Sequence, residues 1–222
     1  MLVRRVGDSG QAFPAYVAAV AGLLFIAFVY FAVGQAASTR NEAQTAADAA
    51  ALAAAQDARE QLRGRWLEVL ADPTQWDQIL RGDGYLDGPA CQRAADLAGR
   101  NGAEVVADGC VRLAEGGDGF EVTVRTTGTI GRSIVPGTES QHVTASAEAV
   151  IESDCTFEVP DPPTSPAPTE TPTEPGDEEE APEPTVGITC DGEVWDIDLE
   201  DIDPEDPALP DADDLFTVRL TG

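Results

Sequence analysis

Lysine is absent from this chain of 222 residues, and histidine occurs once, at position 142. Without lysine there is no phosphate-binding lysine of the P-loop type and no lysine that could form a Schiff base. A single His142 also excludes a helix that holds a metal ion between two histidines. The sequence therefore lacks the side chains on which several common enzyme classes depend.

Positive charge is also scarce. The chain has 41 acidic residues against 13 bases, all of them arginine, and its formal net charge is −28. Nucleic-acid binding depends on basic side chains that neutralise phosphates, so a nucleic-acid partner is not expected. Residues 152–222 hold 23 of the acidic residues and one base, Arg219. The excess acid is thus concentrated in the C-terminal third, where a run of like charges predicts solvated or disordered chain.

Cysteine is present four times but never as a CxxC pair, so a zinc site is not expected. An even number of cysteines in an oxidising compartment favours disulfides. The spacing favours Cys91 with Cys110 and Cys155 with Cys190, although four cysteines allow three connectivities. Neither paired catalytic carboxylates nor a nucleophile elbow is found, and we expect no enzyme activity, cofactor or metal site.

One long uncharged run lies near the N-terminus. Residues 12–33 are almost purely apolar, which is about the ~20 residues that a helix needs to cross a bilayer. We predict a transmembrane helix at 12–34 after a cytoplasmic segment, 1–11, because Arg4 and Arg5 precede the helix and positive residues favour the cytoplasmic side. An alternative is a secretion signal. Removal of residues 1–36 would leave a secreted or cell-surface acidic binding module.

An alanine-rich stretch follows the apolar run. Residues 35–71 contain one glycine and no proline, and they consist largely of strong helix formers, so the helix is expected to continue out of the membrane. Small side chains let another helix approach closely. The helix-packing candidates are Ala46, Ala47, Ala50, Ala53 and Ala54. They could pack on partner helices or on this chain's own domain, and the sequence leaves both alternatives open.

The remainder predicts an α+β fold outside the membrane. Alternating apolar and polar residues indicate half-buried strands, and a Pro/Thr/Glu-rich stretch indicates a disordered linker. The predicted regions are a small α+β domain at 72–159, the linker at 160–185 and an acidic C-terminal segment at 186–222. Within them we expect a helix at 89–100, a hairpin turn at 115–119, and strands at 104–113, 120–127, 142–151, 186–190 and 216–220.

The N-terminal half resembles the TadE/TadG-like proteins of the tight-adherence (Flp) pilus system. The resemblance extends over residues 7–60. It depends on Gly10–Pro14 at the start of a single apolar helix and on two segments after that helix, Arg40-Asn41 and, above all, Gln44–Ala53. A looser likeness to actinobacterial TadG-related proteins lies at Pro136–Ser140. The resemblance implies a pilin-like protein that is anchored in the cell membrane and assists pilus assembly or secretion together with other Tad components.

Two features of that family are missing here. A prepilin peptidase site would place glutamate at the fifth position after the cleaved glycine, but that position is Ala15 counted from Gly10 and Gln11 counted from Gly7. The Asp-x-Ser-x-Ser metal motif of long TadG proteins is also missing. The resemblance therefore implies neither pilin-type processing nor metal-dependent adhesion for this chain.

Overall fold

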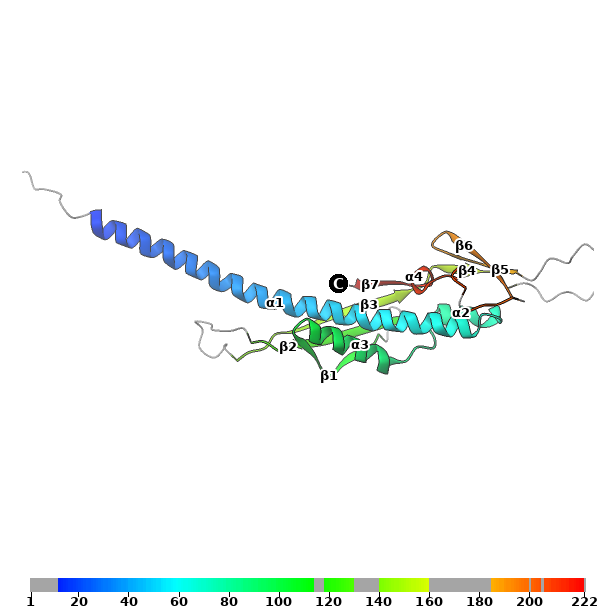
Figure 1. Cartoon of the computed structure of the whole chain (residues 1–222). Helices are drawn as coiled ribbons and strands as arrows, with labels where there is room; N and C mark the ends of the chain where they lie inside the picture. The colour runs from blue at the N-terminus through cyan, green and yellow to red at the C-terminus, as the bar shows by residue number, and fades with distance from the viewer. Residues whose placement is uncertain are drawn as a thin grey trace, which may run out of the picture.

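The computed structural model describes residues 12–113, 118–129, 140–159, 185–199, 201–204 and 206–221. Its main feature is one helix of 57 residues, α1 (Ala12–Glu68), which runs without interruption from a bare end into a folded body (Figure 1). After Pro14 the helix contains no proline, so no backbone N–H is removed from its interior. The predicted continuation of the apolar helix into the alanine-rich helix is therefore present in the structure.

A turn and two shorter helices follow α1. Asp72 caps the 3₁₀ helix η1 (Pro73–Gln75), because its carboxylate accepts hydrogen bonds from Thr74 N at 3.2 Å and from Gln75 Nε2 at 2.7 Å. Next come α2 (Trp76–Leu80) and α3 (Asp87–Arg100). Helix α1 ends at Glu68, slightly before the Asp72-Pro73 stop expected from the sequence.

Four antiparallel strands form the larger sheet, in the order β1-β2-β3-β7. Phe120, Val122 and Val124 alternate along the second strand and are fully buried, as the period of two predicts. The last strand pairs with β3, with Val218 opposite Ile151, so the end of the acidic C-terminal segment completes the sheet. The strands are β1 (Ala103–Arg112), β2 (Asp118–Thr126), β3 (Thr144–Glu152) and β7 (Thr217–Thr221).

A smaller, three-stranded sheet stands at the end of the body farthest from the bare helix (Figure 1). It consists of β4 (Cys155–Phe157), β5 (Thr185–Cys190) and β6 (Glu193–Asp198), and a short helix, α4 (Ala212–Leu215), leads back to β7. The sequence predicted β5 but not β4 or β6. The residues predicted as the cytoplasmic segment 1–11 lie outside the described part of the chain. So do almost all of the linker 160–185, most of the hairpin turn at 115–119, and most of Pro136–Ser140.

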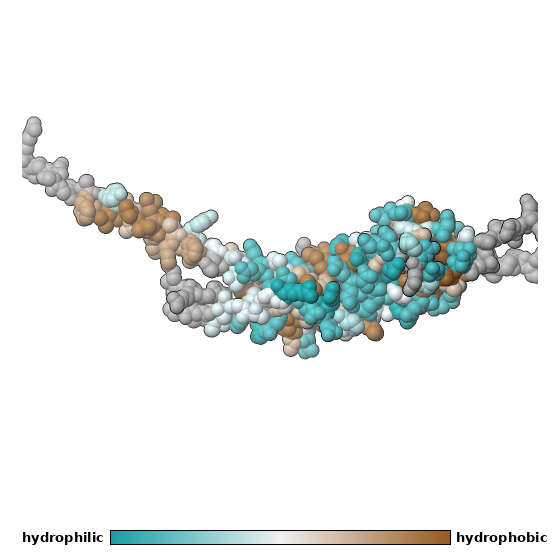
Figure 2. Space-filling view, in the orientation of Figure 1, coloured by the Kyte–Doolittle hydropathy of each residue, from teal (hydrophilic) through white to brown (hydrophobic). Residues whose placement is uncertain are grey.

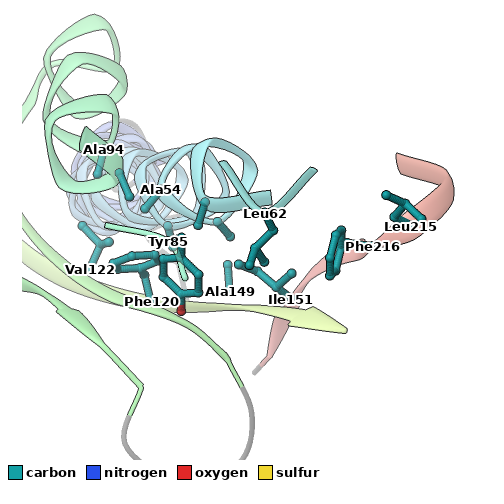
Figure 3. Close-up of a cluster of buried hydrophobic side chains, with 14 of the residues drawn as sticks. Ala54, Leu62, Tyr85, Ala94, Phe120, Val122, Ala149, Ile151, Leu215 and Phe216 are labelled. Atoms are coloured by element: carbon teal, nitrogen blue, oxygen red, sulfur yellow. The ribbon is translucent and has the colours of Figure 1, made fainter. Parts of the chain in front are cut away.

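The core lies between α1 and the inner face of the larger sheet, and α3 packs beside α1 (Figure 3). Aromatic rings fill the far end, where Trp76 stands 5.4 Å from Trp66 and 5.3 Å from Phe157 between ring centroids. Such tilted ring pairs are a favoured packing geometry. The described segments at 37–113, 118–129, 140–159, 185–199, 201–204 and 206–221 thus share one core.

Candidate assembly surface on the long helix

The two halves of α1 have opposite environments. Over its first part the large apolar side chains stand free, and Phe13, Leu23 and Phe31 are each about two-thirds exposed or more, at 74%, 68% and 69%. From Ala43 onward the inner face of the same helix is fully covered. Figure 2 shows the contrast as an apolar rod that projects from a largely polar body.

The bare half has the dimensions of a membrane span. Its most apolar window of 18 residues has a mean hydropathy of 2.5, and none of that window is buried. Residues 13–33 rise by ~32 Å at 1.5 Å each, which matches the ~30 Å hydrocarbon core of a bilayer. Tyr16 and Tyr30 lie near its two ends, where amphipathic rings favour the membrane–water interface.

The alanine candidates lie on the covered half. Ala46, Ala47, Ala50 and Ala54 have no exposed surface, and Ala53 is 5% exposed. The structure places them inside this chain's own body, where α1 lies against α3 and the sheet. In Figure 3, Ala54 of α1 faces Ala94 of α3 across the narrow gap between the two helices. The small side chains therefore permit a close contact within the chain, and they are not available to another molecule.

The four cysteines form the two pairs that the spacing favoured. Cys91 on α3 is joined to Cys110 on β1, and Cys155 on β4 is joined to Cys190, its direct neighbour across the strands on β5. The first bridge fastens α3 to the edge of the larger sheet. The second holds together the chain on either side of residues 160–184. No cysteine is left free.

Charged groups hold the C-terminal strand and the α3 turn in place. Arg219 of β7 donates to both carboxylate oxygens of Glu152 at 2.9 and 2.7 Å, and this bonding lowers the pKa of Glu152. At the other edge, the Arg112 guanidinium lies 3.7 Å from the centre of the Tyr85 ring and donates to Asp87 at 2.9 Å. These contacts are structural and lie in the body, whereas the longest run of exposed large apolar side chains among the described residues lies on the bare half of α1.

Nothing in the described part of the chain gathers metal-binding side chains. Among those residues no group of three or more His, Cys, Asp or Glu is placed to hold a metal ion. His142, expected on a strand surface, lies just before β3 and is exposed; its Nδ1 is 2.6 Å from the carbonyl oxygen of Thr126.

Comparison with known proteins gives one match. Residues 10–57 match the family model described as putative Flp pilus-assembly TadE/G-like, which confirms the resemblance predicted from the sequence. The match covers the bare apolar half of α1 and the alanine-rich part that enters the body. No curated protein and no solved structure matches the chain.

Proposed function

We propose that this TadE/G-like chain is a membrane-anchored, pilin-like accessory protein of a Tad/Flp-type pilus assembly or secretion system, and that it acts by helix packing and not by catalysis. The observation that carries the proposal is the division of α1 into a bare apolar half and a half that forms the spine of the body. The family match spans that division. Because one continuous, rigid helix crosses this division, a movement of its apolar half in the membrane would also move the body outside.

The orientation follows from the charges. Arg4 and Arg5 stand before the apolar half, and the positive-inside bias places them in the cytoplasm. The body, with its two disulfides, then lies outside the membrane, where disulfides persist. The acidic C-terminal third is likewise kept away from the cytoplasmic leaflet.

Partner helices would contact the bare half of α1, because the body covers the alanine face farther along the same helix. Apart from its chain neighbours and the backbone of its own helix, Gly22 has no atom within 4 Å of the position that a Cβ would take, and Ala18 stands one turn before it. Small residues spaced by one turn allow close contact between helices in a membrane. We therefore place the helix-packing surface for other Tad components near Gly22.

The test separates insertion from packing. Gly22→Leu keeps the segment apolar, so the protein should stay in the membrane after alkaline extraction, while its co-purification with other Tad components should fall severalfold because a leucine keeps the backbones apart. Leu24→Ile, on the same bare segment, is the matched control and should leave both properties unchanged. Undiminished co-purification of Gly22→Leu would contradict a packing role for this surface.

A second candidate is the secreted acidic binding module. It is favoured by one observation, that the most apolar window of α1 buries nothing against the body, so the body does not need it. Mass spectrometry of the mature N-terminus distinguishes the two candidates. A protein that begins near residue 37 would be the secreted form, and an intact apolar segment would be the anchored one.

A further inference from the structure

The bare half of α1 has one side of small residues and one side of bulky residues. Successive residues of a helix are turned by about 100° from one another, so residues three and four positions apart share a side. The residues of the small side are Ala15, Ala18, Ala19 and Gly22. The large exposed residues of the bulky side, which lies opposite, include Phe13, Val20, Leu24 and Phe31. Another helix can therefore approach α1 more closely from the small side.

The small side is continuous with the side of α1 that packs inside the body. Because α1 is one uninterrupted helix, residues 36 positions apart are separated by about ten full turns and point the same way. Ala18 is thus in line with Ala54, and Gly22 is in line with Ala58. Both alanines of the body are fully buried, and Ala54 faces Ala94 of α3 (Figure 3). The body therefore stands on the same side of α1 as the small residues.

The bulky side is in line with the solvent-exposed side of α1 in the body. Val20 is 36 residues before Gln56, and Leu24 is 36 residues before Glu60. Gln56 and Glu60 are both exposed. A helix that packs on the small side and continues out of the membrane therefore runs toward the body, whereas one on the bulky side does not.

The body begins a short distance beyond the apolar run. Gln44 follows Gly22 by about six turns and so lies on nearly the same side, and its Nε2 donates to Ser146 O of β3 at 3.3 Å. The near end of the sheet is thus level with residue 44. Gln44 is 11 residues beyond Val33, which ends the exposed apolar run, and those residues rise ~16 Å. A helix along the small side can extend by about ten residues before it reaches the sheet.

The usual inclination between packed helices does not carry a partner helix past the sheet. Helices in membrane bundles mostly cross at about 20°, so over the ~33 Å between the levels of Gly22 and Gln44 a partner helix moves ~11 Å sideways. Helix α1 lies over β2 and β3, the two central strands, and strands are ~4.8 Å apart. A helix ~10 Å across is therefore still stopped by the sheet.

We propose that the small side of α1 binds the transmembrane helix of a different membrane protein, and that this helix extends no more than about ten residues beyond the hydrocarbon. The inference rests on the proposed anchor and its packing surface, and it specifies the kind of partner. A second copy does not fit, because its own α1 continues as a helix to Glu68. Two copies paired through Gly22 would each place a body in the space between their helices.

Cross-linking of the full-length chain in vesicles tests the length limit. Ala18→Cys introduces a small thiol on the small side, and the four native cysteines are all paired. The probe is a peptide of residues 1–36 with the same substitution, which carries the small side without the body; small residues one turn apart let like helices pair. Oxidation should link this peptide to the full-length chain. Adding a rigid helix of ~20 residues, built of Glu-Ala-Ala-Ala-Lys repeats, should lower the yield severalfold, whereas ~20 flexible Gly/Ser residues should not.

The remaining outcomes separate the inference from the proposed function. Leu24→Cys, on the bulky side, is the control, and its yield should not depend on the stiffness of the extension. Equal yields for the rigid and flexible extensions of the Ala18→Cys peptide would overturn the length limit. Disulfide-linked dimers of the full-length Ala18→Cys chain, at the yield of the short peptide, would identify a second copy and overturn the partner. Failure of the short peptide to link would refute close approach at the small side, whereas membrane retention and the co-purification of Gly22→Leu test the proposed function independently.

Discussion

At the scale of the residue, the inside of the body is specified mostly by side-chain size. The alternation of Phe120, Val122 and Val124 was enough to predict the buried face of β2, because a strand turns successive side chains to opposite sides. The alanines of α1 were different. A small apolar side chain fits equally well against a neighbouring protein or against the chain's own helix, so the sequence identified a close contact without identifying its partner.

The carboxyl group of Asp118 is partly buried, which is unfavourable for its charged form. Burial raises the pKa of Asp118, the Arg112 guanidinium lowers it, and the Asp83 carboxylate raises it further. A Cβ added at Gly82 would lie 2.0 Å from Oδ2 of Asp118, so the carboxyl sits where only glycine leaves room. The raised pKa means that the folded state binds this proton more tightly than the unfolded state does.

Asp118→Asn should therefore stabilise the protein at neutral pH. The pKa of Asp118 is higher in the folded than in the unfolded state. As pH rises from the unfolded pKa to the folded pKa, the wild-type protein therefore loses stability, and a protein with a neutral amide at this position does not. The urea midpoint of Asp118→Asn should exceed that of the wild type at pH 7, and the difference should shrink as pH falls toward the unfolded value of 3.8. Asp96→Asn, at an exposed position of α3, serves as the control. A difference that is independent of pH would contradict this account.

At the scale of the element, the predicted helices and strands were found where apolar periodicity is strong. Strands β1, β2, β3, β5 and β7 and helix α3 lie within a few residues of their predicted positions. Strand β4 has three residues, which are too few to show an alternation of apolar and polar side chains. Strand β6 (Glu193–Asp198) begins an acidic run, and that composition suggested solvated chain. The pairing of β6 with β5 outweighs its composition, and pairing between strands is not visible in one segment alone.

The contact between α1 and α3 should tolerate no added bulk. Ala54→Leu places a larger side chain where Ala54 and Ala94 are both fully buried, and overpacking of this kind costs ~1–3 kcal/mol. The free energy of unfolding in urea should fall by about that amount, and the α3 amides should lose protection from hydrogen exchange. Ala37→Leu, on an exposed part of the same helix, should have little effect. An unchanged Ala54→Leu protein would mean that α3 is held mainly by the Cys91–Cys110 bridge.

At the scale of the whole molecule, the body is attached to the apolar segment through an unbroken helix. Residues 37–42 of α1 form the neck between the two, and all of them except Thr39 are exposed. Continuity of the helix was predictable from the lack of proline and the abundance of helix formers. The return of the C-terminal strand to the sheet was not, because 152–222 is dominated by charge.

Ser38→Pro should uncouple the body from its anchor. Proline in a helix interior removes a hydrogen bond and clashes with the preceding turn, at a cost of ~3 kcal/mol or more. Fluorescence energy transfer between a label at Glu193 and the membrane surface should change from a narrow to a broad distance distribution, and co-purification with Tad components should fall. The thermal midpoint of the body should stay unchanged, since its core begins at Ala43. Ser38→Ala is the control, and a narrow distribution for Ser38→Pro would contradict a rigid neck.

The place of β7 in the sheet has a consequence for biogenesis. The spine of the body emerges first, at Ala43, whereas the strand that pairs with β3 is Thr217–Thr221. In the topology proposed above, the nascent chain would present the inner face of α1 and an incomplete sheet until nearly all of it had crossed the membrane. A chaperone outside the membrane would have this interval in which to act, and a chain that stalls before residue 217 would expose the edge of β3 and invite degradation.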